Sequence, residues 1–99
     1  MHPIQTRKAN VLVIEPSTAR RTMLSLAFRQ LKFPSPWKAD SIADALKFMA
    51  SQEILPDWIV TPLCPEAEIN GLALLHLCLK ERDLHNTRVS LLLSPEEAE

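Results

Sequence analysis

The 99-residue sequence has one glycine, no tyrosine and no apolar run approaching the roughly 20 residues that span a bilayer. So little glycine excludes a collagen-like chain, and no glycine-rich loop is present to bind a nucleotide phosphate. The formal net charge of −1 excludes the concentrated positive field of a general nucleic-acid binder, and it gives no reason to expect an anionic membrane surface as partner. These absences leave a small globular domain.

The cysteines and histidines form no metal-binding pattern. Cys64 and Cys78 make neither a CxxC pair nor a zinc-ligand spacing, and the three histidines are scattered. We therefore expect reduced thiols, no metal, no other cofactor and a cytoplasmic location. Residues 1–10 are polar and basic and lack the apolar stretch of a signal peptide.

Four short apolar runs predict strands. They lie at residues 10–14, 37–40, 58–61 and 89–93, each bounded by polar residues or prolines. The second run is flanked by prolines, which favours an edge position in a sheet.

Three helices are predicted between the strands. The first starts at Thr18 behind the capping residue Ser17, and its apolar residues recur at three and four positions. We expect them to form one buried stripe, made of Met23, Leu24, Leu26, Ala27, Phe28 and Leu31.

The second helix is predicted to run through Met49 behind the cap Ser41. The third opens at Gly71 and ends near Arg82, and since its apolar residues cover more than one stripe we expect it to be heavily buried. Residues 94–97 carry a further helix-start signal.

Alternation of strands and helices predicts an α/β fold, a three-layer sandwich around a central parallel sheet. We expect residues 1–9 to be a flexible tail and residues 10–99 to form the domain, as an N-terminal part of a longer protein.

The order and spacing of these elements resemble the receiver domain of response regulators. Residues 11–17 are similar to the receiver opening, where two adjacent acids follow the first strand, and residues 57–62 are similar to the strand that ends in the phosphoacceptor aspartate. Residues 70–72 resemble the Asn/Asp-Gly of the next loop, and residues 91–94 resemble the fourth strand with its terminal Ser or Thr. The resemblance implies a flavodoxin-like sheet of order 2-1-3-4, with the fifth strand absent.

The same resemblance implies a phosphorylation pocket, from which this sequence departs. Receiver phosphorylation needs an acceptor carboxylate and further carboxylates for Mg²⁺. Only Glu15 remains of the acid pair, next to Pro16, and Pro62 stands at the acceptor position. Thr61 offers a hydroxyl if the alignment shifts by one residue, and Ser94 matches the switch hydroxyl. We interpret these five residues as a vestigial pocket without catalytic or metal-binding residues.

The sequence therefore favours a pseudo-receiver, a phosphorylation-independent signalling module that acts through protein–protein interaction and is not an enzyme. The predicted fourth strand is an edge with unpaired backbone groups. The expected partner is another protein, a downstream domain of the same chain, or a second copy paired through that edge. The candidate interaction surface comprises Arg20, Arg21, Met23, Val89, Leu91 and Leu93.

An alternative is an atypical receiver phosphorylated on a non-standard residue, or a small redox protein that uses Cys64. Glu15 and Ser94 favour the first form, whereas no histidine or basic cluster accompanies Cys64 in the sequence. The loop at residues 62–71 is one residue longer than the usual receiver pattern, so its alignment stays open.

Overall fold

Strands and helices alternate along the chain in the computed structural model, which describes residues 9–52, 55–64, 66–81 and 86–94. The elements are β1 (Val11–Ile14), α2 (Thr18–Gln30), β2 (Trp37–Ala39), α3 (Ile42–Gln52), β3 (Trp58–Pro62), α4 (Gly71–Lys80) and β4 (Arg88–Leu92). All seven predicted elements are present. The expected tail, apart from residue 9, lies outside the described residues, as do Arg82 and the helix-start signal after Ser94.

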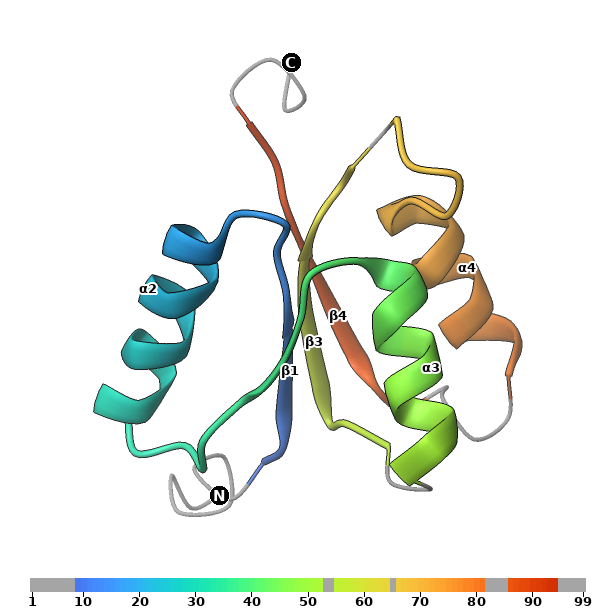
Figure 1. Ribbon diagram of the computed structural model, residues 1–99. Coiled ribbons are helices and arrows are strands. Elements are labelled where there is room, and N and C mark those ends of the chain that lie inside the picture. The colour runs from blue at the N-terminus through green and yellow to red at the C-terminus, as the bar shows by residue number, and fades with distance from the viewer. Residues whose placement is uncertain (1–8, 53–54, 65, 82–85, 95–99) are drawn as a thin grey trace.

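The four strands form one parallel sheet in the order β2-β1-β3-β4. The chain is thus an α/β domain with flavodoxin-like topology, as predicted. Figure 1 shows α2 on one side of the sheet and α3 and α4 on the other.

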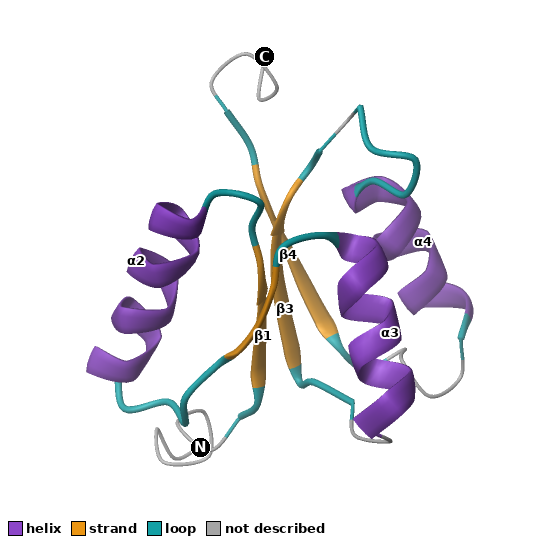
Figure 2. Cartoon of the chain, viewed as in Figure 1, coloured by secondary structure: helices purple, strands orange, loops and turns teal. Residues whose placement is uncertain are grey.

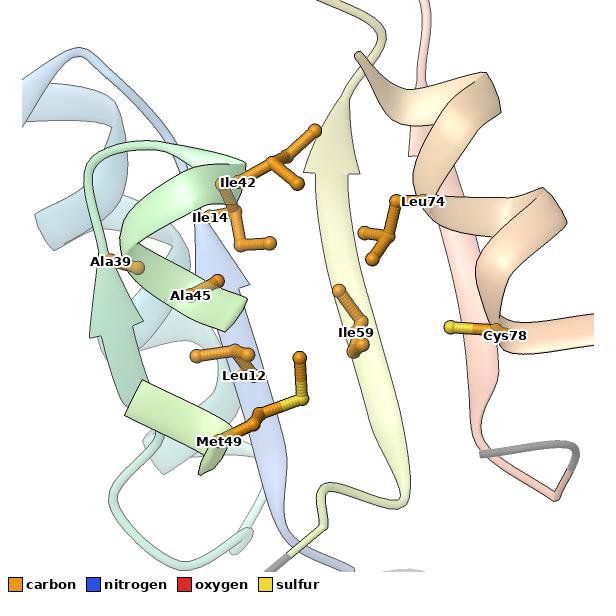
Figure 3. Close-up of a cluster of buried hydrophobic side chains, with 9 residues drawn as sticks. All are labelled: Leu12, Ile14, Ala39, Ile42, Ala45, Met49, Ile59, Leu74 and Cys78. Carbon is orange, nitrogen blue, oxygen red and sulfur yellow. The ribbon is translucent and has the colours of Figure 1, made fainter. Parts of the chain in front are cut away.

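β1 lies at the centre of the sheet and is buried along its whole length, because both of its faces are covered. Leu12 and Ile14 point into the larger core cluster, beneath α3 and α4 (Figure 3). Val11 and Val13 point the other way and pack with Phe28 of α2. The larger cluster comprises Leu12, Ile14, Ala39, Ile42, Ala45, Met49, Ile59, Leu74 and Cys78.

Polar side chains cap the helices and so fix where each one begins. The Ser17 hydroxyl accepts the Arg20 N–H at 3.3 Å, and the Ser41 hydroxyl accepts the Asp44 N–H at 3.0 Å. Both predicted caps are confirmed. Asn70 plays this part for α4, with its side-chain oxygen 2.9 Å from the Ala73 nitrogen.

The predicted buried stripe of α2 is wrong in part. Ser25 and Phe28 are the buried residues of this helix, whereas Met23, Leu26 and Leu31 are exposed. The physical reason is that α2 packs chiefly on β1, so only the side toward that strand is covered.

The expectation that α4 is heavily buried is also wrong. Leu74 and Cys78 are buried against the sheet, but Leu72 and Leu79 are exposed. A helix that rests on one sheet face buries a single stripe, whatever the composition of its outer side.

Candidate functional site

The carboxyl ends of β1, β3 and β4 meet at one end of the sheet, where ligands bind in many open α/β folds. A groove of about 990 Å³ lies there, between α2 and the end of β4. We call it the α2–β4 groove. Its lining residues are Glu15, Pro16, Ser17, Arg20, Met23, Leu24, Ala27, Pro62, Cys64, Leu92, Leu93 and Ser94.

Four of the five residues of the predicted pocket line this groove, so the structure brings them together: Glu15, Pro16, Pro62 and Ser94. Thr61 is not among the lining residues, because its side chain is fully buried beneath the end of β3. Its hydroxyl donates a hydrogen bond to the Pro62 carbonyl oxygen at 2.9 Å.

Glu15 is 5% exposed, and its polar groups hold the turn between β1 and α2. Its carboxylate accepts the Ser17 backbone N–H at 2.8 Å, and its carbonyl accepts the Arg21 guanidinium at 2.6 Å. Its own N–H donates to the Ala39 carbonyl at 3.0 Å, which ties the turn to β2. These bonds give the buried residue a structural role in positioning the start of α2.

Pro62 ends β3 at the position where the receiver resemblance expects an acceptor carboxylate. It lies opposite Leu92 of β4 in the parallel register and is half-buried. A pyrrolidine ring offers no nucleophile at this position.

Among the described residues that line the groove, Glu15 is the one carboxylate. Across the described part of the chain, no group of three or more His, Cys, Asp or Glu residues is placed to hold a metal ion.

The predicted interaction surface divides into residues that line the groove and residues that do not. Arg20, Met23 and Leu93 line it, whereas Arg21 turns toward the Glu15 carbonyl. Val89 packs against the larger core cluster, under α3 and α4.

Leu91 lies beside Gly71, on the same sheet face as Val89. Ser90 faces the opposite side, where it accepts the Trp58 indole N–H at 2.9 Å. By strand alternation Leu92 shares that side, and it lines the groove. Leu92 was absent from the predicted interaction surface, although alternation along this strand separates it from Leu91.

Two cysteines lie in different surroundings. Cys64 is half-buried in the loop after β3, with φ of 50°, and lines the groove. Cys78 is packed in the core, and burial raises the pKa of its thiol, so it remains a neutral apolar group.

Comparison of the chain with protein-family models, with curated proteins and with solved structures gives no match. Among the helices of the described residues, none has both the length and the apolar character needed to cross a membrane.

Proposed function

We propose that this chain is a phosphorylation-independent, receiver-like regulatory module that acts through protein–protein contact. The observation that carries the proposal is the end of β3. Pro62 occupies the position of the acceptor carboxylate, and the neighbouring Thr61 hydroxyl is buried and donates to a backbone carbonyl. The sheet order and the strings at residues 11–17, 57–62 and 91–94 support the likeness to a receiver.

The groove supports contact with another macromolecule. Met23, Leu92 and Leu93 are 69, 40 and 47% exposed, and they border the α2–β4 groove together. Exposed apolar residues that gather on one patch mark interaction sites more often than single exposed ones do.

Self-association through β4 is a second route to such contact. The Arg88 N–H donates to the Asp57 carbonyl at 2.9 Å, so Arg88 bonds toward β3. In a parallel ladder alternate residues bond to opposite sides, which directs the backbone groups of Val89 and Leu91 to the open edge. Two copies can pair antiparallel there. Sedimentation of a strict monomer at high concentration would count against this route.

The phosphorylation-independent part is tested by backbone amide NMR with and without Mg²⁺ and beryllofluoride, which imitates a phosphoryl group on a carboxylate. We expect no shifts at Glu15, Thr61 and Ser94. Incubation with acetyl phosphate should likewise leave the mass unchanged. Saturable shifts at these three residues, or a gain in mass of one phosphoryl group, would contradict the proposal.

A further inference from the structure

A second, smaller hollow lies at the carboxyl end of the sheet, between the start of α3 and the loop that joins β3 to α4. Its volume is about 270 Å³. Figure 2 shows these two segments at the same end of the sheet. We call this hollow the α3 pocket. Its lining residues are Pro16, Asp40, Ser41, Ile42, Ala43, Cys64, Ala67, Glu68 and Ile69.

Backbone hydrogen bonds hold both walls of the α3 pocket. In the loop wall, the Ala67 N–H donates to the Cys64 carbonyl at 3.0 Å and closes a turn. In the helix wall, the Ala45 N–H donates to the Ser41 carbonyl, also at 3.0 Å. A pocket whose walls are already ordered loses little conformational entropy when it is filled.

The interior of the α3 pocket is mainly apolar. Ile42 is 3% exposed, Ile69 is 37% exposed, and Ala43 and Ala67 add small side chains. A volume of about 270 Å³ is below the roughly 300–1,000 Å³ of pockets that enclose drug-sized ligands. The pocket therefore suits one side chain of a partner protein better than a separate small molecule.

The rim of the α3 pocket is acidic. Asp40 contributes an exposed carboxylate beside the helix wall and Glu68 contributes one from the loop wall, and none of the described lining residues is basic. The bases Arg21 and Lys38 line a separate cleft beside β2, which shares Asp40 with this pocket.

The helix N-termini at this pocket do not cancel the two negative charges. An α-helix carries about half a positive charge at its N-terminus, so α3 and the nearby start of α4 together contribute about one. The ionised carboxyls of Asp40 and Glu68 contribute about two negative charges at neutral pH. The rim is thus net negative and complementary to a cation.

An arginine side chain has the chemistry that this pocket requires. Its methylene stem packs on apolar surface while the charged head stays in contact with water. The guanidinium carries five N–H donors in a planar fork and can bond carboxylates on both walls at once, whereas the ammonium of lysine is a compact and strongly hydrated charge.

We propose that the α3 pocket binds an arginine side chain of a partner protein. The stem lies against Ile42 and Ile69, and the guanidinium lies between the carboxylates of Asp40 and Glu68. This inference rests on the proposed function in that the chain acts through protein contact.

The probe is the peptide acetyl-Ala-Arg-Ala-amide, titrated into the full chain and followed by backbone amide NMR. One anchoring side chain should give a dissociation constant of about 1 mM, with saturable shifts at residues 40–43 and 67–69. A twin peptide with citrulline keeps the shape of arginine without its charge and should bind at least tenfold more weakly. A lysine twin should bind about threefold more weakly. Added salt should weaken binding of the arginine peptide.

Variants of the chain locate the binding site. Asp40→Asn and Glu68→Gln should each weaken binding of the arginine peptide at least threefold. The matched control is Glu66→Gln, which should leave binding unchanged, because Glu66 is an exposed acid of the same loop that does not line the pocket. Circular dichroism should give the same spectrum for the three variants and the parent, since all three carboxylates are exposed.

Several outcomes would overturn the inference. They are the absence of saturable shifts up to about 10 mM peptide, equal binding of the arginine peptide and either twin, or equal losses in Glu68→Gln and Glu66→Gln. Failure of the proposed function is read separately, in the beryllofluoride and acetyl phosphate experiments without peptide. A phosphoryl response there contradicts the proposed function whether or not the peptide binds, and absence of peptide binding alone refutes only the arginine site.

Discussion

Gly71, the one glycine of the chain, is placed where a side chain has little room. A Cβ built on it would lie 2.8 Å from Leu91 Cδ2 and 3.2 Å from both the Leu63 Cα and the Pro62 carbonyl oxygen. Favourable carbon–carbon contacts lie near 3.5–4.0 Å. Leu91 can rotate away, but the other two atoms are backbone, and the 2.7 Å hydrogen bond from the Gly71 N–H to the Leu63 carbonyl holds that segment close.

Gly71→Ala therefore sets two effects against each other. Alanine is favoured over glycine in a helix by up to about 1 kcal/mol. Overpacking of a tight contact costs about 1–3 kcal/mol. We expect a net loss of about 1 kcal/mol in the free energy of unfolding, which corresponds to a fall of about 4–8 °C in melting temperature for a domain of this size.

Thermal unfolding monitored by circular dichroism gives the melting temperature, and urea denaturation gives the free energy of unfolding. A double-mutant cycle with Leu91→Ala is the control, because removing the Leu91 side chain should relieve part of the clash and leave a coupling energy of about 0.5 kcal/mol or more. A higher melting temperature for Gly71→Ala, or a cycle without coupling, would refute the reasoning.

Three further variants test the core, one inter-strand hydrogen bond and one pair of acids. Leu74→Ala should lower the free energy of unfolding by about 2–5 kcal/mol in urea, because Leu74 is fully buried on the side of α4 that faces the sheet. Ser90→Ala should cost about 1 kcal/mol and change Trp58 fluorescence, because it leaves the indole N–H without the hydroxyl 2.9 Å away. The hydrogen bond that protonated Asp44 donates to Asp40, and then repulsion by the Asp40 charge, raise the pKa of Asp44 above 3.8, so Asp40→Ala should move that pKa back toward 3.8 in an NMR titration. Because the folded state binds the proton more tightly, stability from this pair is lost as pH rises from 3.8 through the raised pKa, and Asp40→Ala should flatten that slope.

Each of these variants has a control. Leu72→Ala, on the exposed side of the same helix as Leu74, should change the free energy of unfolding by less than about 0.5 kcal/mol. Ser51→Ala removes a serine whose hydroxyl donates to the Phe48 carbonyl in the same helix, and it should leave the tryptophan spectrum unchanged. Lys47→Ala should move the Asp44 pKa the other way, upward, because the Lys47 charge lowers it. If a variant and its control have equal effects, the structural explanation for that variant is wrong.

Local chemistry made much of the fold predictable from the sequence. The continuous apolar run at residues 11–14, with three β-branched residues, has the composition of a strand covered on both sides, and that strand lies at the centre of the sheet. Ser17 and Ser41 are short polar residues ahead of periodic apolar segments, which is what a helix cap requires. The sheet order came from the receiver resemblance together with the alternation of elements.

The buried side of α2 could not be predicted, because its sequence offers overlapping stripes. Met23, Leu26 and Phe28 are all apolar, and tertiary packing alone selects Phe28, which stacks edge-on with Phe33 and Trp58. Ser25 is buried in place of a more apolar residue since its hydroxyl donates to the Arg21 carbonyl within the helix, at 2.9 Å. A periodicity count cannot recognise such a polar residue as part of the core.

The location of the candidate site could be predicted from the sequence, but the full set of residues that line it could not. Glu15, Pro62 and Ser94 were expected together because the receiver resemblance implies that they share one pocket, and they do line one groove. The wall that α2 contributes depends on the rotation of that helix over β1, which no local signal sets. Leu92 was overlooked because the run of three leucines at residues 91–93 hides the alternation of the strand.

The polar groups at this end of the sheet are largely engaged with the chain's own backbone. The Glu15 carboxylate binds the Ser17 amide, and the Thr61 hydroxyl binds the Pro62 carbonyl. In the part of the chain that the structure describes, every buried side-chain nitrogen and oxygen has a hydrogen-bond partner. A phosphoryl switch needs polar groups that gain their best partners only when the ligand arrives. The polar groups here would gain few new hydrogen bonds from such a ligand. Burial of the exposed apolar side chains beside them would instead be favourable in free energy. These contacts support the proposal that the chain acts through protein contact and not as a phosphoryl switch.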